Sequence, residues 1–186
     1  MIELVWPAAR FLAGYVAALE RGWNADTGRA AVAAQEELTR IAGDADRFLA
    51  EQVMREPSGE TVTLPDGSQV PRLPGYRRWL WDGEFCGLIG LRWQPGTQAL
   101  PAHCLGHIGY AVVPWKRGRG YATAALRQLL PEARAEGLSY VEITTDPDNL
   151  ASQRVIEANG GVLHERFAKP ESFGGTTGLR YRIALA

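Results

Sequence analysis

Apolar residues recur at helical spacing in the first third of the chain. Between Pro7 and Arg21 they fall three and four residues apart, and the proline stands where a helix can begin. The same spacing continues from Gly28 to about Arg55, where Ala42-Gly43-Asp44 interrupts it. We therefore predict an amphipathic helix, followed by either one bent helix or two short ones.

Beyond the helical segments the pattern changes to short alternating runs separated by turn residues. Pro65-Asp66-Gly67 and Asp82-Gly83 both contain the Asp-Gly dipeptide, which adopts the positive dihedral angles of tight hairpin turns. We expect a hairpin over residues 60–69 and a second pair of antiparallel strands over residues 77–81 and 85–93.

Strands and helices alternate in the second half of the chain. The expected elements are a strand over 105–113, a helix over 119–136, a strand over 139–145, a helix over 150–158, and strands over 162–167 and 179–185. Pro131 lacks the backbone donor that a helix interior needs, so we expect a kink or an early helix end near Gln128. This alternation predicts an α/β fold.

Length and charge narrow the possible functions. A chain of 186 residues, 46% hydrophobic and 22% charged, suits one domain spanning 1–186, with residues 1–56 as a helical front end. A net charge of −1 offers no general attraction to nucleic acid or to a membrane surface, so neither is an expected partner.

Cysteine and histidine usage does not indicate a metal site or an exported protein. Cys86 and Cys104 show no zinc-ligand spacing with the three histidines, so we expect no metal. The first residues do not resemble a signal peptide, and no apolar run has membrane-spanning length. We expect a soluble, cytoplasmic protein.

The segment from Val113 to Ala122 joins a strand to a helix through two glycines. Gly118 and Gly120 allow a ligand to approach the backbone closely, and the unpaired amides and dipole of a helix N-terminus favour phosphate. Lys116, Arg117 and Arg119 add local positive charge. The spacing fits neither a P-loop nor a dinucleotide fingerprint, which needs a third glycine where this chain has Thr123. A tight turn without a ligand is the alternative.

Arg117-x-x-Gly120-x-Ala122 resembles the acyl-CoA signature Gln/Arg-x-x-Gly-x-Gly/Ala of the GNAT superfamily of N-acetyltransferases. The run Asp148 to Gly161 is similar to the following helix of that superfamily, and the whole of 105–163 resembles a subgroup of bacterial predicted acetyltransferases. This resemblance implies a mixed, mostly antiparallel sheet of about six to seven strands, splayed at the centre, with helices on both faces. It also implies that residues 105–163 form a cofactor-binding core for acetyl-CoA.

The resemblance assigns cofactor contacts by position. Val112 and Val113 would offer backbone groups to the pantetheine arm, which lies like an added strand. Arg117 opens the signature, and the pyrophosphate would be held by the amides of the six residues that follow it: Gly118, Arg119, Gly120, Tyr121, Ala122 and Thr123. Asn149 and Ser152 would lie near the pantetheine. A helix N-cap is the alternative role for Asn149.

Direct transfer needs a base, an acid and an oxyanion donor. His107 is the predicted base, because it lies about where relatives carry a Glu and its reference pKa is about 6.5. A packed structural histidine is the alternative, and Glu142 and Asp146 are substitute bases. An amide near Ala111 or Val112 can serve as the oxyanion donor.

The acid is harder to assign. Many relatives use a Tyr in the helix after Asn149, but this chain has Ile156 at the matching position. Tyr110 or water is then the predicted proton donor for the leaving thiolate.

These residues favour an acetyl-CoA-dependent N-acetyltransferase that acts by direct attack in a ternary complex. The acceptor is a small-molecule or peptide amine, and the protein is a monomer or a homodimer. Two alternatives stay open, namely an acyl-CoA-binding sensor of the same fold and a nucleotide-phosphate binder. Trp79, Trp81 and Trp93 either line the acceptor cleft or pack in the core, as alternating aromatic residues of strands usually do.

Overall fold

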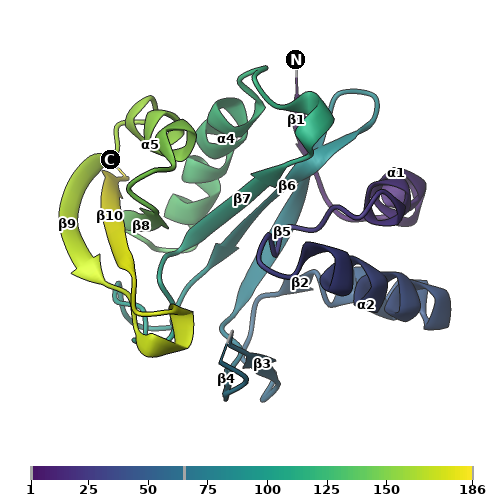
Figure 1. Ribbon diagram of the computed structural model, residues 1–186, viewed down its shortest axis with the longest axis horizontal. Helices are drawn as coiled ribbons and strands as arrows, with labels where there is room; N and C mark the ends of the chain where they lie inside the picture. The colour runs from purple at the N-terminus through teal and green to yellow at the C-terminus, as the bar shows by residue number, and fades with distance from the viewer. Residues whose placement is uncertain (1, 65, 186) are drawn as a thin grey trace. The chain divides into compact units, whose positions relative to one another are not determined.

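A computed structural model of the protein describes residues 2–64 and 66–185 (Figure 1). Its first sheet has the strand order β1 (Glu3–Val5), β5 (Gly75–Trp81), β6 (Phe85–Arg92) and β7 (Ile108–Val112), and β2 (Val53–Met54) pairs with β5. The second sheet has the order β8 (Tyr140–Thr145), β10 (Thr177–Ala184) and β9 (Val162–Ala168). β3 (Thr61–Thr63) and β4 (Gln69–Pro71) form a separate antiparallel hairpin.

Helices connect these strands. The α-helices are α1 (Ala9–Glu20), α2 (Ala30–Gly43), α3 (Ala45–Ala50), α4 (Tyr121–Ala135) and α5 (Leu150–Glu157). Two short 3₁₀ helices are η1 (Pro114–Lys116) and η2 (Glu171–Phe173). The mixed α/β architecture with antiparallel sheets confirms the predicted fold class.

The chain forms two compact units. Unit 1 contains residues 1–54, 76–90 and 110–125, and unit 2 contains residues 55–75, 91–109 and 126–186. β6, β7 and α4 contribute residues to both, so the predicted cofactor-binding core of 105–163 is divided between the units. The single domain therefore stays a prediction.

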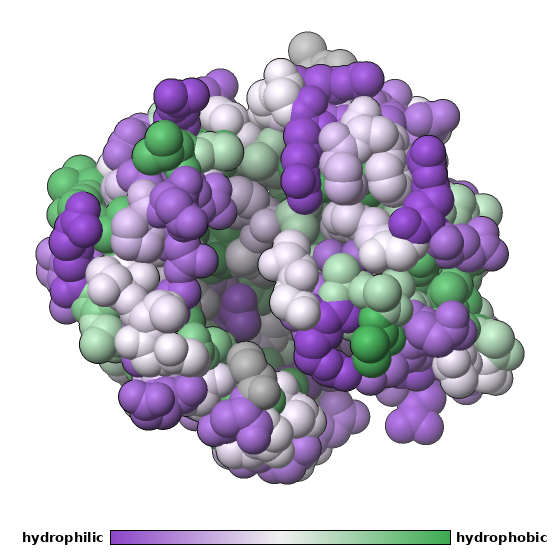
Figure 2. Space-filling model, viewed as in Figure 1, coloured by the Kyte–Doolittle hydropathy of each residue, from purple (hydrophilic) through white to green (hydrophobic). Residues whose placement is uncertain are grey.

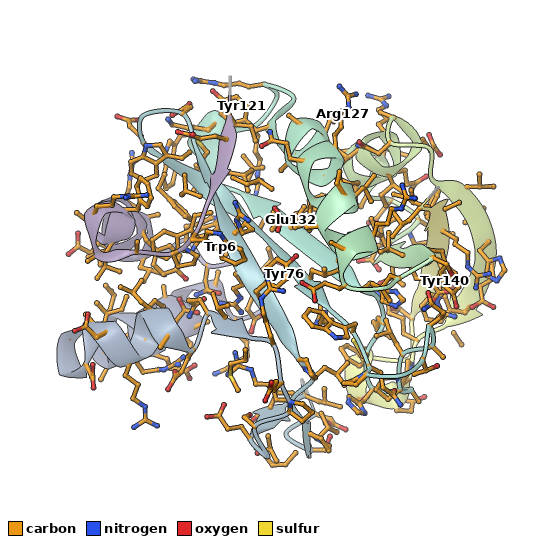
Figure 3. The ribbon with its side chains drawn as sticks, turned by 180° about the vertical axis from the view of Figure 1, so that it is seen from behind. Trp6, Tyr76, Tyr121, Arg127, Glu132 and Tyr140 are labelled. Atoms are coloured by element: carbon orange, nitrogen blue, oxygen red, sulfur yellow. The ribbon has the colours of Figure 1, made fainter. Side chains whose placement is uncertain are left out.

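Aromatic residues form the core of unit 1. Tyr15 on α1 stacks on Trp79 of β5, with ring centroids 4.7 Å apart, and packs edge-on against Phe85 at 5.1 Å. Figure 1 shows α1 and α2 on the same side of β5. In the view from behind, Trp6 and Tyr76 lie side by side (Figure 3), with ring centroids 5.1 Å apart.

The three tryptophans predicted on strands are largely removed from solvent. Trp79 is completely buried, and Trp93, which follows β6, is 8% exposed. Trp81 is half-buried and packs on Phe11 of α1, with ring centroids 4.7 Å apart. The core-packing alternative therefore holds for Trp79 and Trp93.

Unit 2 is built on the sheet of β8, β10 and β9. Both neighbours of the central strand β10 run antiparallel to it, and the β9 register shifts at Arg180 and Tyr181. Val141 and Ile143 of β8 are buried, as is Ile156 of α5. β9 is largely exposed, and Figure 2 shows apolar residues at the surface over this strand.

Most predicted elements lie within a few residues of their expected bounds. The interruption at Ala42-Gly43-Asp44 separates two helices, because the Asp44 carboxylate accepts a hydrogen bond from the Arg47 amide and caps the second one. The strand expected over 105–113 begins later, at Ile108. Strands β1 and β2 were not predicted, since they are too short to show a periodic pattern. Pro65 of the predicted turn lies outside the described residues.

Of the two outcomes predicted for Pro131, the early helix end near Gln128 is wrong, and the kink stays a prediction. Helix α4 continues through Pro131 to Ala135. Leu126, Leu129 and Ala133 are fully buried on either side of the proline, which is itself exposed. Burial of the apolar face thus outweighs the hydrogen bond that Pro131 cannot donate.

Replacement of Pro131 by Ala should therefore stabilise the protein. The backbone amide that alanine restores can donate to the Arg127 carbonyl, and helix propensity improves, so we expect the free energy of unfolding to rise by about 1–3 kcal/mol. Urea unfolding measures the change. Arg134→Ala, at an exposed position of the same helix, is the control and should change it by less than about 0.5 kcal/mol. A less stable Pro131→Ala variant would contradict this account.

Candidate functional site

A loop with unpaired backbone amides follows β7 in unit 1. Residues 117–120, which we call the glycine loop, connect η1 to α4. Gly118 and Gly120 have φ angles of 74° and 73°, in the left-handed region that side chains with a Cβ rarely adopt. The amides of residues 118–122 make no hydrogen bond within residues 2–64 and 66–185. The first bond of the helical ladder is donated by Ala124 to the Gly120 carbonyl at 3.0 Å.

The space in front of the glycine loop is open. A Cβ atom placed on Gly118 or Gly120 would meet nothing within 4 Å. The helix dipole adds partial positive charge at the same place. Open space, unpaired donors and the dipole together suit a phosphate group.

The edge of β7 offers a second set of backbone groups. The Val113 amide donates to the Cys86 carbonyl of β6 at 3.0 Å. Because backbone groups alternate along an antiparallel strand, the Val112 N–H and C=O face away from β6. β7 is the last strand in the order of its sheet, so these groups lie on a sheet edge.

This alternation separates the two predicted pantetheine contacts. Val112 presents backbone groups at the open edge, whereas the Val113 amide is already bonded to Cys86. The Val112 carbonyl accepts one hydrogen bond, from Arg117 Nε at 3.2 Å. An extended ligand can add to the edge at Val112 more readily than at Val113.

Side chains on β7 also alternate. Val113 is buried and Ala111 partly buried against the aromatic core of unit 1. The side chains of Tyr110 and Val112 therefore leave the strand on the opposite face. Both are half-buried.

The positive charge expected from Lys116 is neutralised. Its side chain is buried, and Nζ lies 2.6 Å from Asp82 Oδ1 and 2.9 Å from Glu84 Oε2. Arg117 and Arg119, both within the glycine loop, are exposed and keep their charge available. The loop thus carries two available guanidinium groups rather than three available cations.

Asp82 lies in the turn between β5 and β6 and binds two residues at once. Lys116 contacts one carboxylate oxygen, and the Tyr121 hydroxyl donates to Oδ2 at 2.6 Å. Burial alone would raise the pKa of Asp82, but hydrogen bonds from Lys116 and Tyr121 outweigh it and hold that pKa well below its usual range. Burial would lower the pKa of Lys116, but its bonds to Asp82 and Glu84 raise it above its usual value.

Sequence reasoning missed the role of Asp82. The Asp-Gly dipeptide predicted the hairpin turn, and that interpretation accounted for the aspartate completely. No local pattern marks Asp82 as the partner of Lys116, because the two residues are 34 positions apart in the chain.

Asn149 and Ser152 lie in unit 2 at the start of α5. Asn149 Oδ1 accepts a hydrogen bond from the Ser152 amide at 3.0 Å, which confirms the helix N-cap. Asn149 is exposed, and its Nδ2 makes no hydrogen bond to any other described residue. The cap therefore leaves one amide group available to a ligand, and the pantetheine contact stays a prediction.

His107 ties the start of β7 to β8 within unit 2. Its backbone amide donates to the Glu142 carbonyl at 2.8 Å, and its Nδ1 accepts from the Glu142 amide at 2.9 Å. Nδ1 must be unprotonated to accept this bond, so the neutral ring carries its proton on Nε2. Nε2 is buried and makes no hydrogen bond in the part of the chain that the structure describes.

These contacts do not suit a general base. The side chain of His107 is 1% exposed, and its one basic nitrogen is occupied by the Glu142 amide. Burial lowers the pKa of His107 below 6.5, although the nearby Glu142 carboxylate opposes this shift. The geometry favours the packed structural alternative, and the catalytic role of His107 stays a prediction.

The substitute bases are held in ion pairs. The Glu142 carboxylate accepts from Arg182 at 2.7 Å, and Asp146 pairs with Lys169. Ile156, at the position where the family resemblance predicts a Tyr, is completely buried and offers no proton donor.

Neither a metal centre nor a membrane-spanning helix is present in the described residues. No group of three or more His, Cys, Asp or Glu side chains there is arranged to hold a metal ion. None of the helices in residues 2–64 and 66–185 combines the length and hydropathy of a membrane span.

Comparisons with known proteins point to one family. The family model described as "Acetyltransferase (GNAT) domain" matches residues 21–162. The chain is similar in structure to RimL, a ribosomal L7/L12 alpha-N-protein acetyltransferase solved with coenzyme A. The TM-score is 0.65, the identity is 15%, and the match covers 99% of this chain and 94% of that one. A search of curated proteins found no match.

A second similar structure is the microcin C7 self-immunity acetyltransferase MccE, solved with acetyl-CoA and AMP. Its TM-score is 0.60 at 14% identity, and the match covers 98% of this chain and 92% of that one. At such identities the two likenesses show a shared fold.

Replacement of His107 by Gln tests the buried state of the imidazole. Since the folded pKa lies below 6.5, the unfolded chain binds more protons once the pH falls below that value, and the wild type loses stability there. We expect the wild type to lose up to about 1.4 kcal/mol per pH unit more than the variant.

Urea unfolding at several pH values between neutral and mildly acidic gives the slope of the free energy of unfolding against pH for the wild type and for His107→Gln. His164→Gln, which removes an exposed imidazole from β9, is the control. Equal slopes for the wild type and His107→Gln would refute the buried neutral state. If His107 nevertheless acts as the base, its removal will alter the pH dependence of turnover.

Proposed function

The chain belongs to the GNAT acetyltransferases, and we propose that it transfers the acetyl group of acetyl-CoA to a primary amine within a ternary complex. The observation that carries this proposal is the set of unpaired amides at residues 118–122, at the N-terminus of α4. Two exposed arginines, Arg117 and Arg119, lie in the same loop. Such a set of donors is costly unless a ligand or water satisfies it.

The diphosphate of the cofactor would bind at the glycine loop. Backbone amides from Gly118 to Ala122 would donate to its oxygens, and the helix dipole would favour its charge by about 0.3–1 kcal/mol. Thr123 is the last residue of the segment that we propose to bind the diphosphate. Arg117 and Arg119 supply the positive charge.

The pantetheine arm would continue along the edge of β7. The backbone groups of Val112 are directed to that edge, so the arm would bond there as an added strand. Asn149 and Ser152 are further proposed contacts on the basis of family resemblance. The thioester carbonyl would then lie near the β7 backbone, where the Val112 amide can stabilise the developing oxyanion.

The acyl transfer itself would proceed by direct attack. The neutral amine forms a nitrogen–carbon bond to the thioester carbonyl, the carbon–sulfur bond breaks, and its electron pair leaves on the thiolate. The amine proton passes to His107 or, given its occupied Nδ1, to solvent water. Tyr110 is the proposed acid, because its side chain leaves β7 on the same face as that of Val112 and the family's tyrosine position holds Ile156.

The proposed reaction requires an amine as the acceptor, and two acetyltransferases of similar fold guide the choice of its class. RimL is an alpha-N-protein acetyltransferase of ribosomal L7/L12, whereas MccE is a self-immunity acetyltransferase for microcin C7. We propose an amine on a small molecule or a peptide N-terminus. The cytoplasmic location and the monomeric or homodimeric state stay predictions.

Two measurements test the function. We expect acetyl-CoA to bind more tightly than ATP in calorimetry, and we expect thiol release from acetyl-CoA with at least one amine in a panel of amino acids, aminoglycosides, polyamines and short peptides. Tighter binding of ATP would refute the cofactor. Tight acetyl-CoA binding without turnover on any amine would favour the sensor alternative.

Replacement of Gly120 by Val tests the placement of the diphosphate. The new side chain would enter the open space at a φ of 73°, where the phosphate approaches. We expect the dissociation constant of CoA to rise at least about tenfold. Calorimetry measures the change.

Gly137 provides a matched control at the other end of α4. It also has a positive φ, 89°, and a Cβ atom placed on it would meet nothing within 4 Å. Gly137→Val therefore imposes similar backbone strain but lies outside the proposed site, so CoA affinity should be retained. Equal losses in both variants would mean that strain, rather than contact with the cofactor, causes the effect.

A further inference from the structure

One carboxylate connects the two residues that flank the glycine loop. Lys116 immediately precedes the loop and Tyr121 immediately follows it. Asp82 accepts from the Lys116 ammonium with Oδ1 and from the Tyr121 hydroxyl with Oδ2, both at 2.6 Å. The two ends of the glycine loop are thus held by the two oxygens of a single side chain.

The position of Asp82 is itself fixed by its hairpin turn. The Asp82 amide donates to the Glu84 carbonyl at 3.2 Å, and the Glu84 amide donates back to Asp82 Oδ1 at 3.3 Å. Asp82 and Lys116 have side chains that are 13% and 7% exposed, so water competes little for their contact. Hydrogen bonds between charged groups in such surroundings are stronger than neutral ones.

The glycine loop needs an external constraint of this kind. Gly118 and Gly120 both have positive φ, and the amides of the loop from Gly118 onward gain no energy from hydrogen bonds within the described residues. A loop held in its ligand-binding shape avoids the entropy cost of ordering when the ligand arrives.

We propose that Asp82 is a positioning residue for the diphosphate of CoA, because it fixes both ends of the glycine loop and so orients the unpaired amides before the cofactor binds. This inference rests on the proposed function, since it assigns the glycine loop to the diphosphate. Asp82 does not contact the cofactor in this account, but acts through Lys116 and Tyr121.

We call Asp82, Lys116 and Tyr121 the carboxylate clamp. Tyr121 is also the first residue of α4, so its side chain links the clamp to the helix. Figure 3 labels Tyr121 at the start of α4, the end at which the unpaired amides lie. The hydrogen bond to Asp82 raises the pKa of Tyr121, as expected for a phenol that donates to a carboxylate. The hydroxyl is therefore protonated at neutral pH and serves as the donor.

The variant Asp82→Asn tests the proposal with little change of shape. Its amide nitrogen can no longer accept, so either Lys116 or Tyr121 loses its acceptor and the charge pair is lost. We expect the dissociation constant of CoA, measured by calorimetry on the full chain, to rise at least about tenfold.

A shorter acetyl donor separates positioning from general damage. S-acetylpantetheine carries the same thioester but no diphosphate. With the best amine of the panel, kcat/KM for acetyl-CoA should fall at least about tenfold, whereas kcat/KM for S-acetylpantetheine should change less than about twofold. Equal losses with both donors would overturn the proposal in favour of a structural role.

Two further variants complete the design. Glu84→Gln removes the other carboxylate that contacts Lys116. The Glu84 side chain is 78% exposed, and the Tyr121 hydroxyl donates to Asp82 rather than to Glu84. We expect Glu84→Gln to change the dissociation constant of CoA by less than about twofold. Tyr121→Phe removes only the hydroxyl, and it should weaken CoA binding even if Asp82→Asn folds poorly.

The effects of Asp82→Asn and Tyr121→Phe should not add, because both variants disrupt the same clamp. Unchanged CoA affinity in both variants, with the wild type binding CoA, would overturn the clamp alone. A wild type that does not bind acetyl-CoA would overturn the proposed function instead.

Discussion

Exposed backbone amides at the start of a helix can bond water, but a ligand finds them already oriented only if other contacts hold the chain in one conformation. In this protein those amides follow β7, and the contacts are the two bonds of the Asp82 carboxylate to Lys116 and Tyr121. The strand, the clamp and the helix that begins at Tyr121 place the donors together in unit 1. Every proposed contact with a diphosphate depends on this arrangement.

The alternation of β7 gives the same strand two different tasks. Val113 bonds to β6 and packs in the aromatic core, which fixes the strand. Val112 turns its backbone groups to the open edge, where an extended ligand can bond. Rigid attachment on one side and available backbone groups on the other are what a strand-like cofactor arm requires.

Buried polar residues changed the interpretation of two sequence signals. Lys116 looked like a third cation for phosphate binding, but its charge is used by Asp82 and Glu84. His107 looked like a base, but its acceptor nitrogen is used by the Glu142 amide. In both cases the residue type suggested a role in binding or catalysis, but its polar group is bonded to a partner more than 30 positions away in the chain.

The sequence by itself determined most of the helices and strands and the glycine loop, because hydrophobic period, turn dipeptides and glycine spacing are local properties. It also identified the family signature around Arg117 and Gly120. It did not show the short strands β1 and β2. Only the tertiary structure decided that α4 continues through Pro131, that Val112 rather than Val113 faces the open edge, and that Asp82 joins both ends of the loop. These outcomes depend on burial and on partners distant in the chain, which no local pattern encodes.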